Sequence, residues 1–160
     1  DMATLPQLIK EDIQALDLVL AEILTRSEAT TALIVDKGGF LITCQGEQDA
    51  FDLTTISALA AGAYLANQTI ANLIHEQHFT CTYQQGEKFS LLAINVDDNC
   101  LLLIIFRAQI GVGVVKFYAT RIRERIAGQL ERAHDRDPRA GLDLSALNLA
   151  DARPLFKRKA

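Results

Sequence analysis

Three side chains that could bind a metal ion lie close together in the sequence: His75, His78 and Cys81. Imidazole and thiolate groups are typical zinc ligands, but a structural zinc site needs a fourth ligand that converges with them. No second pair of such ligands is present to complete the site. The trio also crosses from an expected helix end into an expected strand, where Cys81 alternates with its neighbours as a core residue would. We therefore expect no metal site, and we expect the histidines to lie near a helix C-terminus, where the dipole favours them.

A segment with two glycines, Gly111-Val-Gly-Val-Val-Lys116, follows an expected strand and opens an expected helix. A phosphate-binding loop in this position needs four residues between its first glycine and a Gly-Lys-Ser/Thr triplet. Here Lys116 follows valine and precedes phenylalanine, and the third glycine of a dinucleotide-binding loop is missing. No Gly-x-Ser-x-Gly nucleophile motif is present, and no cysteine has a histidine partner placed by a known motif. We expect no cofactor, no catalytic residues and no enzymatic activity.

The charge of the chain argues against nucleic acid as a partner. The 160 residues carry a formal net charge of -4. One predicted helix has a basic face, but Glu124 and Glu131 are interspersed along it, which is typical of a solvated helix surface. Its basic residues are Lys116, Arg121, Arg123, Arg125 and Arg132.

The longest uncharged stretch runs from Leu53 to Ile74 and is rich in alanine, leucine and isoleucine. These residues favour a helix, and the single Gly62 costs only about 1 kcal/mol relative to alanine. A surface helix normally keeps one charged face, so this one is expected to be covered on more than one side, partly by a partner. Membrane insertion is not expected, because polar residues are spread along the stretch. These residues are Thr54, Thr55, Ser57, Asn67, Gln68, Thr69 and Asn72.

The other elements are two amphipathic helices and five short strands. Apolar residues repeat at helical spacing from Leu5 to about Arg26 and from Val114 to about Ala133. Thr4 can cap the first helix, and Pro6 is tolerated in its first turn. Alternating or continuous apolar runs predict strands, and the almost wholly apolar run from Cys100 to Phe106 predicts a central strand that is covered on both faces. The strand segments are 31–36, 40–45, 79–84, 89–96 and 100–106.

The resulting order is helix, two strands, helix, three strands and helix, which favours an antiparallel α+β layer over alternating βαβ units. One domain is expected over residues 1–133. A polar linker and a tail follow over residues 134–160, and apolar residues in the tail suggest a docking segment.

The cysteines Cys44, Cys81 and Cys100 are odd in number and lie in apolar or alternating runs, which is typical of buried thiols in a reducing compartment. The N-terminal residues lack a basic region followed by an apolar core, so no signal peptide is expected. We therefore expect a soluble cytoplasmic protein.

Four segments together resemble the roadblock/LC7 family, and within it most closely the bacterial MglB group. The resemblance covers roughly residues 5–133 and is a pattern of the whole fold, without a catalytic signature. The segments are ALIVDKGGFLITCQG (Ala32–Gly46), DLTTISALAAGAYLANQTIANLI (Asp52–Ile74), YQQGEKFSLLAINVDDNCLLLIIF (Tyr83–Phe106) and GVGVVKFYATRIRERI (Gly111–Ile126).

The resemblance implies a profilin-like α-β-β-α-β-β-β-α fold. Its five-stranded antiparallel sheet has the middle helix on one face and the first and last helices on the other. It also implies a homodimer that pairs edge strands and middle helices into a ten-stranded sheet. Such dimers bind one Ras-like small GTPase of the MglA type across the paired helices. They activate it without inserting an arginine, in connection with cell polarity or gliding motility.

Carried onto this sequence, the resemblance implies a GTPase-binding stripe on the middle helix and a second contact through the tail. The stripe comprises Ala58, Ala61, Leu65, Thr69 and Asn72, and the tail residues are Leu147, Leu149, Leu155 and Phe156. The sequence departs from the family at the basic end of the tail and at Tyr64 and Leu65, where small residues are common.

Two other functions remain open from the sequence. A scaffold of the same fold would hold a partner without altering GTP turnover. A ligand-sensing domain would bind a small molecule in a pocket between sheet and helices.

Overall fold

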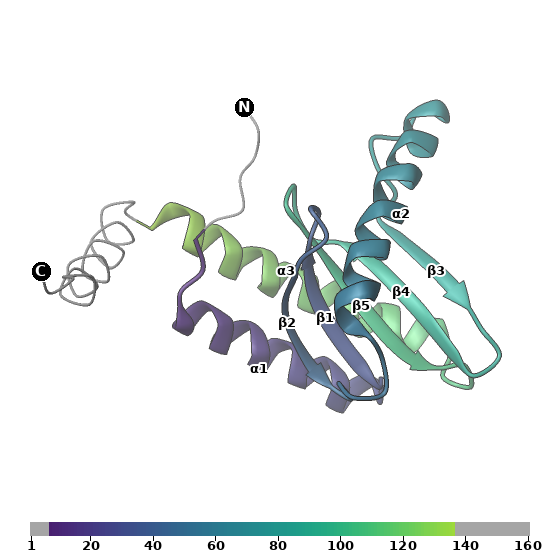
Figure 1. The fold of residues 1–160 in the computed structure, drawn as a ribbon, viewed down its shortest axis with the longest axis horizontal. Helices are drawn as coiled ribbons and strands as arrows, with labels where there is room; N and C mark the ends of the chain where they lie inside the picture. Colours follow the sequence, from purple (N-terminus) through teal and green to yellow (C-terminus); the bar gives the residue numbers. More distant parts are fainter. Residues whose placement is uncertain (1–6, 137–160) are drawn as a thin grey trace, which may run out of the picture.

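The computed structural model describes residues 7–136 of the chain and confirms the predicted order of elements (Figure 1). The first half contains α1 (Lys10–Ser27), β1 (Thr31–Asp36), β2 (Leu41–Gly46) and α2 (Leu53–Leu73). The second half contains β3 (Cys81–Gln85), β4 (Phe89–Asn95), β5 (Cys100–Arg107) and α3 (Val112–Asp135).

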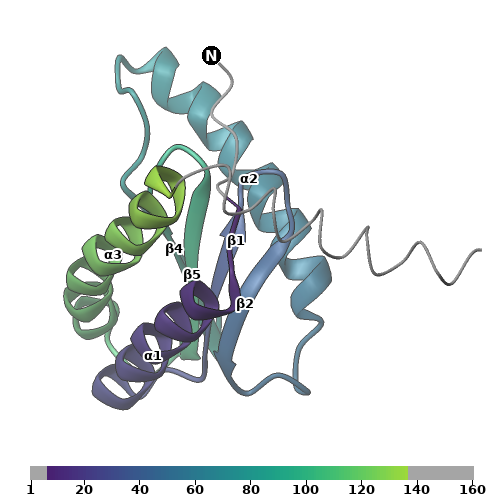
Figure 2. The same ribbon diagram turned by 90° about the vertical axis from the view of Figure 1, so that its left-hand side faces the viewer.

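The strands form one antiparallel sheet in the order β2-β1-β5-β4-β3. Helices α1 and α3 pack side by side on one face, and α2 lies on the other (Figure 2). The predicted α+β class, and the division of the helices between the two faces, are therefore confirmed.

The core consists of two hydrophobic layers on either side of the sheet. Leu102, Ile104 and Phe106 of β5 face α1 and α3, whereas Leu101 and Leu103 face α2. The run from Cys100 to Phe106 is buried throughout because β5 is the central strand and is covered on both faces. This is the position that its almost wholly apolar composition predicted.

Both outer helices differ from their predicted boundaries. Helix α1 begins at Lys10, where the Asp12 carboxylate accepts a hydrogen bond from the Ile9 N–H at 2.9 Å. Thr4 and Pro6, the expected cap and first turn, lie outside the described residues. Helix α3 begins at Val112, two residues before the predicted start at Val114, because Gly111 serves as its N-cap. It ends at Asp135, two residues beyond the expected domain end at 133.

Alanine substitutions at two glycines, Gly46 and Gly62, test how far the local backbone conformation tolerates a side chain. Gly46 has a φ of +96°, and a Cβ there would lie 2.3 Å from the Thr30 carbonyl oxygen. We expect Gly46→Ala to lower the free energy of unfolding by about 2 kcal/mol or more, because strain and a backbone clash add. Gly62→Ala, in the middle of α2 with nothing within 4 Å, should instead raise it by about 0.5–1 kcal/mol. Urea denaturation of both variants measures the difference, and equal stability would contradict the expectation.

No helix within residues 7–136 combines the length and apolar character that crossing a bilayer requires.

Candidate functional site

Helix α2 begins where the sequence predicts because Asp52 caps it. The Asp52 carboxylate accepts hydrogen bonds from the Thr55 N–H at 3.1 Å and from the Thr55 hydroxyl at 2.6 Å. The hydroxyl bond, followed by the backbone bond, lowers the pKa of Asp52 below its usual value. The helix ends at Leu73, after which His75 adopts a left-handed conformation with φ of 66°.

One face of α2 packs against the sheet. Four residues of this face are buried: Leu53, Ser57, Ala61 and Ala71. Three half-buried residues, Ile56, Ala60 and Tyr64, pack against the hydrophobic layer between α2 and the sheet, which contains Leu33, Val35 and Leu103. The apolar residues at these positions hold the helix on β1 and β2. The first half of the helix is therefore anchored on the sheet by its inner face.

The opposite face of α2 is apolar and open. Leu59, Leu65 and Leu73 are 68%, 59% and 75% exposed, and Ile70 and Ile74 are also exposed. The sequence of α2 contains no acid or base, so these side chains have no charged neighbour on their own helix. Exposed apolar side chains concentrated on one uncharged helix typically mark a protein-binding site. Nothing within residues 7–136 covers this face.

The predicted stripe is only partly on this surface. Ala58, Leu65, Thr69 and Asn72 are exposed, whereas Ala61 is only 3% exposed and belongs to the buried side. The resemblance placed Ala61 on the stripe, but in this structure Ala61 lies on the side of α2 that meets the sheet. The tail residues Leu147, Leu149, Leu155 and Phe156 lie outside the described residues.

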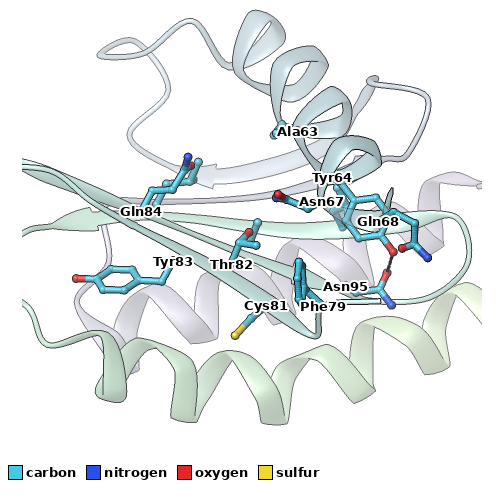
Figure 3. Close-up of a pocket in the computed structure, with 14 residues that line it drawn as sticks. Ala63, Tyr64, Asn67, Gln68, Phe79, Cys81, Thr82, Tyr83, Gln84 and Asn95 are labelled. Atoms are coloured by element: carbon cyan, nitrogen blue, oxygen red, sulfur yellow. Dashed lines mark hydrogen bonds between the residues drawn. The ribbon is translucent and has the colours of Figure 1, made fainter. Parts of the chain in front are cut away.

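A cavity separates the second half of α2 from the sheet, because the helix diverges from the strands and projects past them (Figure 1). Its volume is about 310 Å³. Figure 3 shows Tyr64, Asn67 and Gln68 reaching in from α2, and Thr82 and Gln84 reaching up from β3. The sequence interpretation missed these residues. The available signal was the polar spacing of Tyr64, Asn67 and Gln68 along an otherwise apolar helix.

Hydrogen bonds hold two walls of this cavity. The Tyr64 hydroxyl donates to Asn95 Oδ1 at 3.3 Å, and Lys37 Nζ lies 4.6 Å from the centre of the Tyr64 ring. The Gln68 amide nitrogen donates to the Gln77 carbonyl. The other amide atom, Gln68 Oε1, is buried and has no partner among the described residues.

The three candidate ligands His75, His78 and Cys81 do not converge. His75 is exposed beyond the end of α2, and Cys81 points away from α2 and packs against the layer beneath α1 and α3 (Figure 3). Among residues 7–136, no group of three histidine, cysteine or acidic side chains could hold a metal ion.

All three cysteines are free thiols, and Cys100 is buried while Cys44 and Cys81 are half-buried. Burial raises the pKa of the Cys100 thiol to about 12, and it also raises the pKa of Cys44. These two thiols are therefore protonated and poorly nucleophilic at neutral pH.

The basic face of α3 is exposed, as the sequence predicted, at Lys116, Arg121, Arg125 and Arg132, whereas Arg123 is half-buried. Arg123 Nε donates to the Asn95 carbonyl at 2.6 Å, and Arg125 forms an ion pair with Glu22 of α1. The Arg125 bond lowers the pKa of Glu22. These arginines join α3 to β4 and α1, so they have structural roles that a local charge pattern does not reveal.

Asp12 is a buried charged residue whose role the sequence interpretation missed. It is 1% exposed and accepts hydrogen bonds from Arg136 at 2.7 and 2.9 Å and from Gln129 at 2.9 Å. Its bond to Arg136, followed by those to Ile9 and Gln129, outweighs burial and lowers the pKa to about 2. The signal was an acid three residues after the helix cap, which is the second half of a capping box.

Several solved structures are similar to this chain over most of its length. A structure described as MglB with tetrameric arrangement has a TM-score of 0.76 and 27% identity, covering 82% of this chain and 99% of that one. Myxococcus xanthus MglB has a TM-score of 0.75 and 25% identity, covering 79% and 96%. The gliding protein MglB from Thermus thermophilus has a TM-score of 0.75 and 28% identity, covering 82% and 99%.

Comparison with curated protein sequences gave no match. The sequence pattern of the Roadblock/LC7 domain matches residues 15–106, which is more than half of the chain and runs from α1 through β5. Together with the α-β-β-α-β-β-β-α order and the five-stranded antiparallel sheet, this match shows that the chain belongs to the Roadblock/LC7 family.

Proposed function

We propose that this protein is a non-catalytic, homodimeric regulator of a Ras-like small GTPase of the MglA type, acting in the cytoplasm as a GTPase-activating protein. The observation that carries the proposal is the open, uncharged face of α2, with Leu59, Leu65 and Leu73 more than half exposed. Similarity to the MglB structures supports this class of partner. A role in polarity or gliding motility follows from the same likeness, since one of those structures is described as a gliding protein.

The GTPase-binding surface proposed here comprises the exposed residues Ala58, Leu65, Thr69 and Asn72. Ala58 and Thr69 are small, so a partner backbone can approach the helix closely between the larger side chains. Leu65 lies at the centre of this row and is suited to fill a partner pocket, as buried anchors do in protein interfaces. Ala61 lies on the buried side of α2 and supports this surface indirectly, because its small side chain keeps the helix close to the sheet.

Homodimerisation is supported by the free edge of the sheet. Strand β3 lies at one end of the strand order, and its residues Tyr83 to Gln85 are exposed. An edge strand presents unpaired N–H and C=O groups that can pair with another strand. Antiparallel pairing of two β3 strands would make a ten-stranded sheet and bring the two α2 helices to the same face.

The tail supplies a second GTPase contact in this proposal, through Leu147, Leu149, Leu155 and Phe156. The described chain ends at Arg136, which its two hydrogen bonds to the buried Asp12 fix to the start of α1. Arg136, the last described residue, therefore lies on the face of the sheet that carries α1 and α3, opposite to α2.

GTP turnover tests the proposal directly. An MglA-type GTPase should form a complex with this protein on gel filtration and hydrolyse GTP faster when the protein is present. The mechanism supplies no arginine, so the activated rate must come from the GTPase's own residues. No complex and no change in rate would exclude the proposed function.

The nucleotide dependence of binding separates a regulator from a scaffold. A regulator that favours the hydrolysis-competent conformation must bind the GTP-loaded form more tightly, since it can shift that equilibrium only by its differential affinity. Equal affinity for GDP- and GTP-loaded partner, with unchanged turnover, would instead support the scaffold.

A further inference from the structure

We propose that the groove between α1 and α3 is the docking site of the chain's own segment 142–151 while no partner is bound. The groove lies on the face of the sheet opposite to α2, where the two helices run side by side (Figure 2). All of its described lining residues belong to α1 and α3, so it is separate from the edge strand β3 and from the proposed GTPase-binding surface.

The α1 side of the groove is apolar. Ala15, Leu18 and Val19 line it, and the Leu18 side chain is 74% exposed. On the facing side Gly128 of α3 has no side chain, and nothing lies within 4 Å of the position that a Cβ would take there. The groove has a volume of about 490 Å³, which is room for several leucine side chains at about 30 Å³ per water-sized group.

The α3 side of the groove is basic. Arg121, Arg125 and Arg132 line it together with a single acid, Glu124. Arg125 is paired with Glu22, but neither Arg121 nor Arg132 forms an ion pair within residues 7–136. These two exposed guanidinium groups can therefore donate hydrogen bonds to the carboxylates of a docked segment.

The composition of segment 142–151, LDLSALNLAD, complements both sides of the groove. It contains four leucines and two acids, Asp143 and Asp151, and no basic residue. Its charge of -2 is opposite to that of the three arginines and one glutamate that line the groove. Residues 153–160 carry four basic residues and no acid, so the same comparison excludes them as the docked part.

The last described residue places this segment beside the groove. Helices α1 and α3 run antiparallel, because Asp12 pairs with Arg136 and Glu22 pairs with Arg125. Arg136 therefore lies near one end of the groove, about 6 Å along α3 from Arg132.

The length of the chain after Arg136 is sufficient for docking. Residues 137–141 connect it to Leu142, and an extended chain of this length spans up to about 20 Å. From Arg132 to Arg121 the groove follows α3 for about 16 Å, and ten residues cover about 15 Å even as a helix. Pro138 and Gly141 are residue types that favour the turn needed to direct the chain back along α3.

The covalent link favours the chain's own segment over a free partner. A link this short holds the segment at an effective concentration on the order of 1 mM. A contact with a dissociation constant of about 0.5 mM would then be formed in about two-thirds of the molecules. A separate partner would need the same concentration in solution to compete.

Docking has one consequence that rests on the proposed function. Leu147 and Leu149 belong both to segment 142–151 and to the proposed second GTPase contact, so the GTPase must displace them from the groove. At the docked fraction of about two-thirds, this displacement costs about threefold in affinity. The cost is small because the main GTPase-binding surface lies on α2.

NMR of the full-length, isotope-labelled protein tests the docking. Leu147→Asn/Leu149→Asn removes two of the four leucines without changing the charge, and should weaken docking about tenfold, to about one-sixth of the molecules. The backbone amide signals of Leu18, Gly128 and Arg132 should shift, whereas that of Leu65 on α2 should not. Leu155→Asn/Phe156→Asn, outside the segment, is the matched control and should leave the groove signals unchanged.

An exchange of charges tests the electrostatic part of the contact. Arg121→Glu/Arg132→Glu should release the segment, and adding Asp143→Lys/Asp151→Lys should restore the docked signals. A merely structural role of the two exposed arginines would not be rescued in this way. The thermal midpoint of unfolding, which should stay unchanged, reports whether the charge-reversed variant is folded.

A synthetic peptide of residues 142–151 tests the groove itself. Added to Leu147→Asn/Leu149→Asn, it should shift the same groove signals back with a dissociation constant of about 0.5 mM.

Four results would overturn the proposal: unchanged groove signals in Leu147→Asn/Leu149→Asn, equal shifts in the Leu155→Asn/Phe156→Asn control, no binding of the peptide, and no rescue by the charge exchange. Shifts in the parent protein that grow with its concentration would also overturn it, because a second copy of the chain would then supply the segment. None of these measurements contains a GTPase, so failure of the proposed function would leave their outcome unaffected.

Discussion

Leu65→Arg is expected to weaken binding of the GTPase by about a hundredfold or more while leaving the fold unchanged. Leu65 is 59% exposed and lies in the middle of the proposed binding surface. An arginine there would place an unpaired charge in a contact whose α2 side is otherwise uncharged, and a central interface residue carries about 2–4 kcal/mol. Leucine and arginine have similar helix propensities, so α2 itself should be unaffected.

The measurements are the dissociation constant for the GTP-loaded GTPase and the thermal midpoint of unfolding. Leu18→Arg is the matched control, since Leu18 is a 74% exposed leucine on α1, on the opposite face of the sheet. We expect Leu18→Arg to bind like the parent protein. Normal binding by Leu65→Arg, with an intact fold, would show that the GTPase binds elsewhere.

Asp12→Ala is expected to lower the free energy of unfolding by about 3 kcal/mol at pH 7. The substitution leaves Arg136, Gln129 and the Ile9 N–H without their shared acceptor. Removing one partner of a buried pair costs about 3–5 kcal/mol, and the partial exposure of Arg136 places this pair at the lower end. Urea denaturation measures this loss of stability. The control is Glu11→Ala: Glu11 is an exposed acid in the same helical turn, so this variant should lose only about 0.5 kcal/mol of unfolding free energy.

The difference in the free energy of unfolding between the parent protein and Asp12→Ala should decrease as the pH falls. The folded state lowers the pKa of Asp12 from 3.8 to about 2. The carboxylate therefore stabilises the fold fully above the unfolded pKa, and this contribution is lost as the pH falls through the folded pKa. Such a change in pKa corresponds to about 2 kcal/mol. The stability gap should thus narrow to about 1 kcal/mol near pH 2, and a constant gap between pH 7 and pH 2 would contradict this origin.

Local patterns in the sequence were sufficient for the elements and for the class of fold. The apolar run from Cys100 to Phe106 predicted a central strand because only a strand covered on both faces tolerates such composition. The uncharged stretch predicted α2 correctly at its start and within one residue at its end. Element ends were less reliable at α1 and α3, where a buried carboxylate and a glycine cap determine the first turn.

The periodicity of the sequence was not sufficient to predict which residues of α2 form the site. The family resemblance grouped Ala58, Ala61 and Leu65 on one stripe, but neither the resemblance nor helical spacing states how far the sheet reaches around the helix. Ala61 is buried because α2 lies on β1 and β2 there, while the second half of the helix diverges and leaves the cavity open. The angle between a helix and a sheet depends on side-chain packing from several strands, so no single segment encodes it.

The sequence by itself determined that this chain forms an antiparallel α+β domain with one uncharged helix, because strand alternation and helical periodicity are local properties. Only the tertiary structure decided which side of that helix stays open, and that its inner side encloses a polar cavity. It also joined Asp12 to Arg136 across 124 positions of the chain. Such contacts depend on how elements that are far apart in the sequence pack together, and the residue spacing within one segment contains no information about that packing.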